Sequence, residues 1–331
     1  MQLSLALRKE RLDKVDVILK EATASGSVLS ASALVRQGKD ERRWVVGKTR
    51  KADPVYLLAS ITKPMTVAGV MVLVDRGEVK LADPVRKYIP EFKGDGREAV
   101  LVRHLLTHTS GLPDMLPENE ALRKRHAPLS EFVAGSCRVP LLFAPGTQCK
   151  YQSMGILLAA EIAERITKTK LRDWLKKLVF DPIGMKSTAL GLGQYKIPET
   201  EQSQVPAHTD WDWNSPYWRD LGAPWGGAHS TTTDVMRFLD SYLAPNGRKA
   251  MITNQNAGLN EPWGLGFMVT AAKFSKACSP DTFGHWGSTG TVCWADPKTD
   301  TRMVLLTTKP ADESRASVLG PVSDAVAEAA A

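Results

Sequence analysis

The spacing of apolar residues predicts a helix at the start of the chain, followed by a pair of strands. Within residues 8–22, apolar side chains recur every three or four positions from Leu12 to Leu19, which is the spacing of one helix face. Residues 27–35 and 43–46 are strand-like, and a polar, glycine-containing break at 37–40 lies between them. Such a break between two runs predicts an antiparallel hairpin.

A second helix is expected to begin at Ser60. From Pro64 to Asp75 the apolar residues cover every face, so that no polar face is left for solvent. Gly77 ends the run, as expected of a glycine that follows a helix C-terminus. The pattern therefore predicts a helix buried at the centre of the protein.

The middle of the chain is expected to be mostly helical, and a long loop follows it. Helical periods occur at 104–108, 130–137, 154–167 and 171–179. Periodicity disappears at 184–228, and a loop of this length in a compact domain is usually functional. Its tryptophans either line a substrate cleft or simply pack the loop: Trp211, Trp213, Trp218 and Trp225.

The last third of the chain returns to strands between helices. Residues 232–243 show a helical period, and three strand-like runs follow at 264–270, 291–295 and 302–308. A closing helix is expected at 313–330.

The two early strands and the three late strands can form one sheet only if the two ends of the chain meet. We therefore expect an α+β protein with an antiparallel five-stranded sheet. The terminal helices would cover one face of this sheet, while the helix after Ser60 and an inserted, mostly α region at about 78–228 would cover the other. The expected organisation is a single unit over residues 1–331, with its α/β part at about 1–77 and 229–331.

Composition places the chain among ordinary globular proteins, with 43% hydrophobic and 24% charged residues. Lys and Arg number 43 against 36 Asp and Glu, but the basic residues are scattered, and their densest run, 123–125, is short. We interpret this basicity as a solvated surface, so no nucleic-acid partner is expected. No membrane span is expected either, because the longest apolar run, 67–74, is far shorter than the roughly 20 residues that a membrane helix needs.

The beginning of the chain and its cysteines bear on the cellular compartment. Residues 1–7 run directly into charged residues and lack both a basic leader and a cleavage site, which favours a cytoplasmic protein. A periplasmic or secreted protein remains the alternative if a leader precedes this sequence. The cysteines form no C-x-x-C pair and are expected to be buried thiols, although a pairing of Cys278 with Cys293 stays open: Cys137, Cys149, Cys278 and Cys293.

Ser60-Ile-Thr-Lys63 is the only S-x-x-K sequence in the chain. At i and i+3 on a helix, the two side chains share a face. A lysine in apolar surroundings loses part of its preference for the charged form, so Lys63 could receive the hydroxyl proton of Ser60 and make that oxygen a nucleophile. The alternative is a helix cap followed by a surface lysine.

Two further segments could join this pair. Tyr151 and Ser153 lie at an expected helix start, and a tyrosine beside a lysine ammonium is favoured as phenolate, which would let it relay protons. His285 to Ser288 lies on or beside the strand before 291–295, where free backbone N–H groups can bind an oxyanion. Alternatively, Tyr151 is a half-buried aromatic and His285 a satisfied polar residue at a strand end.

These segments, in their order, resemble the serine β-lactamase superfamily, in its branch of class C β-lactamases, D,D-peptidases and family VIII carboxylesterases. The match runs from about residue 56 to about residue 308. The motifs that carry it are Leu58-Ala-Ser-Ile-Thr-Lys-Pro-Met-Thr66, 77–92 with its Leu-Ala-Asp-Pro-Val core, His104-Leu-Leu-Thr-His-Thr-Ser-Gly-Leu-Pro-Asp114, Tyr151-Gln-Ser-Met-Gly155, Gly226-Gly-Ala-His-Ser-Thr231 and His285-Trp-Gly-Ser-Thr-Gly290.

The resemblance implies a β-lactamase/transpeptidase-like fold and a set of roles. Ser60 would be the acylated nucleophile, and Lys63 its general base or proton relay. Tyr151 would help to activate Ser60 and later the deacylating water. The backbone N–H groups of Ser60 and Ser288 would form the oxyanion hole.

The chain departs from the family pattern at two substrate-binding positions. His285 stands where lactamases and peptidases carry the lysine of Lys-Thr-Gly, and Ser153 stands where the family usually has Asn. Because His is neutral for much of the time near pH 7, it suits the carboxylate of penicillins or peptides less well than lysine does. Residues expected to bind substrate are Ser153, His285, Trp286 and Gly287.

The resulting hypothesis is a serine hydrolase that acts through an acyl-enzyme on ester or amide bonds of small molecules, most of all a carboxylesterase-like enzyme. The alternatives are a D-amino-acid peptidase or amidase, a β-lactamase, and a non-catalytic scaffold with the penicillin-binding fold. No metal or cofactor is expected, because His104 and His108 have metal-like spacing but lack the Glu of H-E-x-x-H. The oligomeric state stays unknown.

Overall fold

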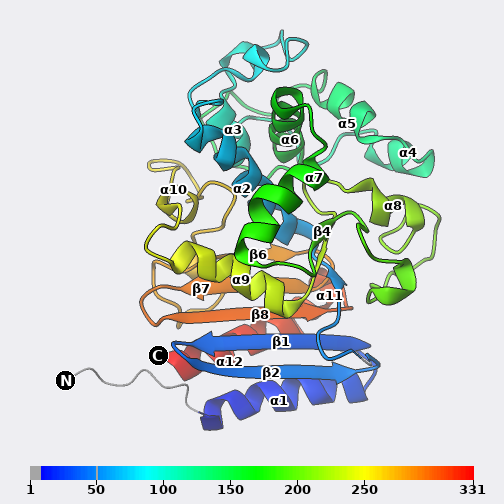
Figure 1. The fold of residues 1–331 in the computed structure, drawn as a ribbon, viewed down its shortest axis with the longest axis vertical. Helices are drawn as coiled ribbons and strands as arrows, with labels where there is room; N and C mark the ends of the chain where they lie inside the picture. Colours follow the sequence, from blue (N-terminus) through cyan, green and yellow to red (C-terminus); the bar gives the residue numbers. More distant parts are fainter. Residues whose placement is uncertain (1–8, 50) are drawn as a thin grey trace.

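The computed structural model describes residues 9–49 and 51–331 of the chain, and Figure 1 shows their arrangement. The helices are α1 Lys9–Ala24, α2 Thr62–Asp75, α3 Val102–Leu106, α4 Asn119–Lys124, α5 Leu129–Ser136, α6 Met154–Thr167, α7 Leu171–Leu175, α8 Pro216–Leu221, α9 Thr232–Leu243, α10 Lys249–Ile252, α11 Ala311–Ser314 and α12 Gly320–Ala330. The strands are β1 Ser30–Gln37, β2 Asp40–Gly47, β3 Tyr56–Leu57, β4 Ala189–Leu190, β5 Ala228–Ser230, β6 Phe283–Gly287, β7 Thr291–Asp296 and β8 Thr301–Thr307.

Five antiparallel strands form the main sheet, in the order β2-β1-β8-β7-β6. The first strand pairs with the last along its length, so the two ends of the chain meet as predicted. In Figure 1, α1 and α12 lie along one face of this sheet, while α9 and most of the other helices lie beyond the other. The α+β class, the five-stranded sheet and the terminal helices are confirmed.

Two apolar cores lie on the two faces of the sheet. Side chains of α1 and α12 pack with the sheet in one core, where Val15 and Val326 are fully buried. α2 lies in the larger core on the other face, together with α6 and α9. Most of its side chains are buried on every side, as the continuous apolar run from Pro64 predicts.

The strand predicted at 264–270 is wrong. Gly266 has a φ of +87°, a conformation that β-strands do not adopt, and this segment contributes only isolated bridges through Met268. The fifth strand is β6, which pairs with β7. Its sequence, Phe-Gly-His-Trp-Gly, contains two glycines in five residues, and glycine is depleted in strands.

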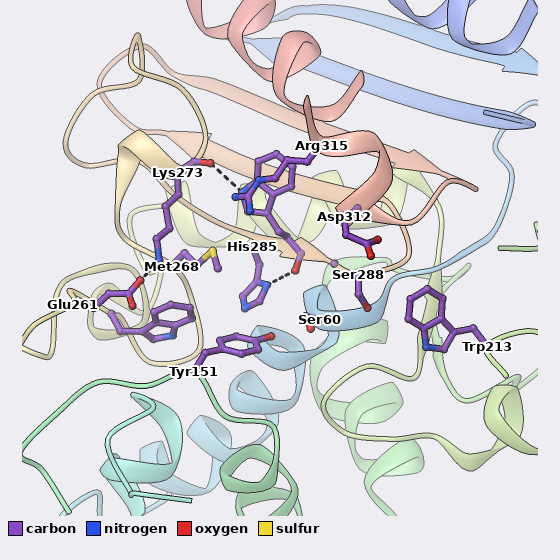
Figure 2. A pocket seen from close by; sticks show the side chains of 14 residues that line it. Ser60, Tyr151, Trp213, Glu261, Met268, Lys273, His285, Ser288, Asp312 and Arg315 are labelled. Carbon is purple, nitrogen blue, oxygen red and sulfur yellow. Dashed lines mark hydrogen bonds and ion pairs between the residues drawn. The ribbon is translucent and has the colours of Figure 1, made fainter. Parts of the chain in front are cut away.

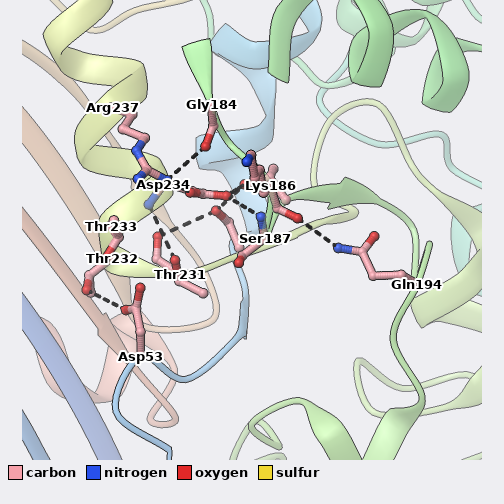
Figure 3. A network of polar contacts seen from close by, with 12 residues as sticks. Asp53, Gly184, Lys186, Ser187, Gln194, Thr231, Thr232, Thr233, Asp234 and Arg237 are labelled. Carbon is pink, nitrogen blue, oxygen red and sulfur yellow. Dashed lines mark hydrogen bonds and ion pairs between the residues drawn. The ribbon is translucent and has the colours of Figure 1, made fainter. Parts of the chain in front are cut away.

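The segment 184–228 is only partly irregular, which corrects the prediction of a plain loop. It contains α8 and β4, and β4 pairs with β5 in a small sheet of order β3-β5-β4. A polar network ties this segment to the start of α9 (Figure 3). Asp234 accepts hydrogen bonds from Ser187 N at 2.6 Å, Thr188 Oγ1 at 2.9 Å and Arg237 Nη1 at 2.8 Å.

Three further predictions concern the ends of the chain, its cysteines and membranes. The predicted compartment depends on residues 1–7, which lie outside the described part of the structure.

The four cysteines are free thiols, and those at 137, 149 and 293 are buried, so Cys278 and Cys293 form no disulfide. In residues 9–49 and 51–331 no helix has the length and hydropathy to span a membrane. The division into an α/β part and an inserted helical part stays a prediction.

Candidate active site

Ser60 and Lys63 face each other at the turn that opens α2. Lys63 Nζ donates hydrogen bonds to Ser60 Oγ at 3.0 Å and to the carbonyl oxygen of Trp225 at 3.0 Å. The side chain of Lys63 is fully buried, with 0% exposure. Lys63 is therefore not a surface lysine after a helix cap, and the contact predicted from its i, i+3 spacing is present.

The surroundings of Lys63 favour its neutral form. Burial lowers the pKa of Lys63 from 10.5 to about 7, and the field of Asp114 opposes that shift. A neutral amine has a lone pair, so Lys63 Nζ can accept a proton from the hydroxyl that it contacts.

The chain segment before Ser60 is held by the β6–β7 hairpin. Thr289 Oγ1 donates to the Leu57 carbonyl at 2.6 Å, and Thr291 Oγ1 donates to the Leu58 carbonyl at 2.8 Å. Ala59 has a φ of 48°, a left-handed conformation that costs roughly 1–2 kcal/mol in an L-residue. These bonds offset that cost and fix the turn that presents Ser60.

Gly287 permits this close approach. A Cβ at this position would lie 2.3 Å from the Leu58 carbonyl oxygen and 2.1 Å from Thr291 Oγ1, closer than any side chain tolerates. The glycine therefore lets β6 approach the turn before Ser60. This packing role was not expected from the sequence, which placed Gly287 only among the substrate-binding residues.

Tyr151 lies on the other side of the pair. Lys63 Nζ is 4.7 Å from the centre of the Tyr151 ring. Burial raises the pKa of Tyr151 above its usual value, and a hydrogen bond with Ser60 opposes that shift. The expected phenolate is therefore wrong, because Tyr151 stays a protonated phenol beside a lysine that is itself half neutral near pH 7.

His108 holds the backbone on both sides of Tyr151. Its carbonyl oxygen accepts from Lys150 N at 2.9 Å, and its Nδ1 accepts from Gln152 N at 3.2 Å. The His108 ring lies 4.8 Å from the Tyr151 ring and 4.5 Å from the Trp263 ring. This residue thus positions the phenol through two hydrogen bonds and a ring contact.

His285 is a neutral, enclosed side chain at this site. Burial lowers the pKa of His285 to about 3, and the field of Lys63 adds to the shift. Its Nδ1 lies 2.6 Å from the Trp286 carbonyl oxygen, which can only accept, so Nδ1 carries the hydrogen. Nε2 is then an acceptor, and it meets no donor in the described part of the chain.

A cavity of about 600 Å³, which we call the first cavity, contains Ser60 in its wall. Figure 2 shows the ring of Tyr151 below His285, with Ser288 beside Ser60 and Trp213 across from Tyr151. Trp286 and Gly287 also line this cavity. Ser153 does not, because its hydroxyl donates to Asp114 Oδ1 at 2.6 Å and it lines a separate cavity.

Comparison with known proteins identifies the family of the chain. A family model described as Beta-lactamase matches residues 15–327. The chain belongs to the Beta-lactamase family.

A curated relative, Esterase EstB from Burkholderia gladioli, is 33% identical to the chain over 218 residues. That match covers 60% of this chain and 54% of EstB, so the chain matches about half the length of that relative.

Solved structures show the same fold. EstCE1, described as a hydrolase with promiscuous acyltransferase activity, superposes with a TM-score of 0.80 at 17% identity, over 97% of this chain and 100% of its own. A D-amino acid amidase from Ochrobactrum anthropi SV3 gives a TM-score of 0.79 at 22% identity, over 96% and 98%. At these identities the likeness concerns the fold, and it confirms the β-lactamase/transpeptidase-like architecture.

Some residues around Ser60 were not identified from the sequence. Trp263, Met268 and the ion pair of Lys273 with Glu261 line the first cavity, although they lie in segments without a motif. His108 belongs to the motif at 104–114, but only the folded chain shows that it holds the backbone beside Tyr151. The two histidines with metal-like spacing are used differently, since His104 Nδ1 accepts from Leu101 N at 3.1 Å. Among the described residues no group of three or more His, Cys, Asp or Glu side chains could hold a metal ion.

Proposed function

We propose that this protein is a serine hydrolase that cleaves carboxylic esters through an acyl-enzyme on Ser60. The observation that carries the proposal is the 3.0 Å contact between Ser60 Oγ and a fully buried Lys63 whose pKa is lowered to about 7 by that burial. A scaffold or binding module has no physical need for a lysine stripped of its hydration beside a serine.

Acylation begins when Lys63 Nζ takes the proton of the Ser60 hydroxyl. Oγ then attacks the ester carbonyl, and the oxygen that becomes negative is held by the backbone N–H groups of Ser60 and Ser288. As the tetrahedral intermediate collapses, the bond to the alcohol breaks and the alcohol oxygen receives a proton. Tyr151 is a protonated phenol in contact with Ser60, so it delivers that proton and is reprotonated from Lys63.

Deacylation reverses the proton path. Water enters where the alcohol left, gives its proton to Lys63 through Tyr151, and attacks the acyl carbonyl. The bond to Ser60 Oγ breaks, Oγ recovers a proton, and the carboxylic acid leaves. Lys63 and Tyr151 thus serve both halves of the reaction as one unit.

His285 supports esters over β-lactams and peptides. A neutral imidazole whose free Nε2 accepts hydrogen bonds is itself no cation for a substrate carboxylate. Of the two cations in the wall of the first cavity, Lys273 is paired with Glu261 and Arg315 lies over the Trp286 ring. Trp286 and Gly287 complete the wall there. The D-amino-acid amidase among the structural neighbours keeps amide hydrolysis as the second candidate.

A substrate panel tests this proposal. It contains p-nitrophenyl butyrate, butyryl p-nitroanilide, a chromogenic cephalosporin and a D-alanyl-D-alanine peptide, each given to the parent enzyme and to Ser60→Ala. The proposal predicts the highest kcat/KM for the ester, and no turnover above background in the variant. Higher kcat/KM for the anilide or the peptide supports the amidase instead, and equal ester turnover by both proteins contradicts the serine mechanism.

A further inference from the structure

A second cavity, of about 310 Å³, also has Ser60 in its wall. It shares Tyr151, Trp213 and Ser288 with the first cavity. Most of the rest of its wall comes from the helical middle of the chain and from the tryptophan-rich segment, and includes Asp114, Met115, Asn119, Arg123, Trp218 and Trp225. Ser60 therefore lies between two chambers, and an ester bound at Ser60 has one for its acyl part and one for its alcohol part.

Arg123 is the cation in the wall of the second cavity. Its guanidinium lies 4.1 Å from the centre of the Trp218 ring and 5.3 Å from that of Trp211. Nη2 donates to the Trp211 carbonyl at 2.8 Å. Within residues 9–49 and 51–331 no Asp or Glu oxygen lies within 4 Å of this guanidinium, whereas the neighbouring Arg125 pairs with Glu131.

Arg123 lacks both hydrogen-bond acceptors and a paired negative charge. Its half-buried guanidinium has lost part of its hydration, and two indole faces and one carbonyl oxygen replace only some of the lost interactions. The planar fork of N–H donors matches a carboxylate, which would supply both the missing acceptors and the missing charge.

Asp114 also lines the second cavity but does not neutralise Arg123. Its Oδ1 is engaged by the Ser153 hydroxyl, and its field acts on Lys63 and Tyr151. The carboxylate whose field reaches Arg123 is Asp212. Asp212 acts only through its field, since no salt bridge joins it to Arg123 among the described residues, so the guanidinium is available to pair with a ligand in the second cavity.

We propose that the second cavity binds the acyl part of the substrate, and that Arg123 pairs with a carboxylate at the far end of that acyl group. The inference rests on the proposed hydrolysis at Ser60 and names its substrate class as half-esters of short dicarboxylic acids. The acyl group stays bound to Ser60 while the alcohol leaves and water enters, so the smaller cavity suits the acyl group and the larger first cavity suits the exchange of alcohol for water.

The reaction itself stays balanced. Ser60 Oγ forms an ester with one carbonyl of the diacid, the alcohol leaves with the proton that Ser60 lost, and water releases the diacid. The carboxylate at Arg123 takes no part in bond making. It acts on affinity and on the orientation of the carbonyl at Ser60.

Matched esters test the inference by proton release in a pH-stat. Monomethyl glutarate and methyl valerate differ at the end of the acyl chain, while acetoxyacetate and ethyl acetate differ in the same way on the alcohol side. Arg123→Gln should lower the ratio of kcat/KM for monomethyl glutarate over methyl valerate by about 10- to 100-fold, the range of a charge-assisted hydrogen bond. Arg123→Lys keeps the charge and should retain part of this preference.

Two control variants locate the effect. Arg315→Gln removes one of the two cations that line the first cavity, Lys273 being the other, and its guanidinium lies 4.3 Å from the Trp286 ring. Arg125→Gln removes an exposed arginine beside α4. Neither should change the glutarate preference. The proposal is overturned if Arg123→Gln leaves that ratio unchanged, if the acetoxyacetate ratio falls instead, if Arg315→Gln produces the loss, or if both Arg123 variants lower all four esters equally.

A binding measurement separates this site from the proposed chemistry. Isothermal titration of Ser60→Ala with glutarate should give a Kd about tenfold or more tighter than the same titration of Ser60→Ala/Arg123→Gln. If glutarate binding depends on Arg123 but turnover does not depend on Ser60, the serine mechanism fails and the site stands. If turnover depends on Ser60 and glutarate binding is indifferent to Arg123, the site fails and the mechanism stands.

Discussion

Burying the charged form of Lys63 should lower the free energy of unfolding by an amount that depends on pH. Lys63→Met removes the titrating group and so should remove this pH-dependent cost. At the lysine's usual pKa of 10.5, roughly one molecule in 3,000 is neutral at pH 7, whereas at the pKa of about 7 that burial gives Lys63 about half are neutral. Because each tenfold change is worth about 1.4 kcal/mol, holding this lysine in the folded protein at pH 7 costs on the order of 5 kcal/mol.

The sign of the pH dependence follows from the lowered pKa. Between about pH 7 and pH 10.5 the unfolded chain keeps a proton on Lys63 that the folded protein has lost, so the parent becomes more stable as pH rises. Lys63→Met has no such group. The unfolding free energy of the variant minus that of the parent should therefore be highest at the pH 7 end of this range. It should fall by about 1.4 kcal/mol per pH unit towards pH 10.

Guanidinium unfolding of both proteins at pH 7, 8 and 9 measures this difference. The variant also loses the hydrogen bond to the Trp225 carbonyl, which costs about 1–3 kcal/mol but adds the same amount at every pH. The slope with pH is thus the diagnostic quantity. A difference in unfolding free energy that does not change between pH 7 and pH 9 would refute the lowered pKa, and with it the account of Lys63 as the base.

Other predictions concern the walls of the site. His285→Lys should raise kcat/KM for a cephalosporin relative to a neutral ester by roughly 10- to 100-fold, and an unchanged or reduced ratio with an intact circular dichroism spectrum would remove His285 from that position. Gly287→Ala should lower stability by about 1–3 kcal/mol in chemical unfolding, because its Cβ would lie 2.3 Å from the Leu58 carbonyl oxygen, and wild-type stability would contradict that geometry. His108→Ala should lower kcat at least about tenfold by releasing Tyr151, while His108→Asn, which keeps an acceptor and tolerates its φ of 60°, should retain most activity; equal loss in both would contradict the positioning role.

Segments with a clear apolar pattern explain why much of the fold could be predicted from the sequence. α1 carries an apolar stripe at helical spacing, whereas α2, β7 and β8 contain continuous apolar runs that indicate elements buried on all sides. β6 was not among the three predicted late strands, although His285 was expected on or beside a strand before 291–295. The two glycines of β6 hide a strand that tertiary pairing with β7 imposes. The small sheet was missed because β4 and its partners have only two or three residues, too few to show any period.

In the candidate site, too, residues in local motifs could be predicted and properties that depend on tertiary packing could not. Ser60, Lys63 and Tyr151 lie in local motifs, so their spacing and resemblance identified them. The protonated state of Tyr151 depends instead on how completely the folded chain removes water from it, and the hold of His108 on its neighbours depends on chain segments about 40 residues apart meeting in space. In the sequence, Arg123 was noticed only as part of a short basic run. Its position beside Trp218 results from tertiary packing that no local pattern encodes.

The role of Ser60 as the nucleophile is most directly tested by mass spectrometry of the protein after reaction with a fluorophosphonate, which a reactive serine attacks with loss of fluoride. The parent, Ser60→Ala and Lys63→Met are treated with a fluorophosphonate at pH 7.5, digested and mapped. A nucleophilic Ser60 with Lys63 as its base should give one adduct on the peptide that contains Ser60, much slower labelling in Lys63→Met, and no adduct in Ser60→Ala. An adduct on another residue of the parent, or equal labelling of parent and Ser60→Ala, would contradict this role.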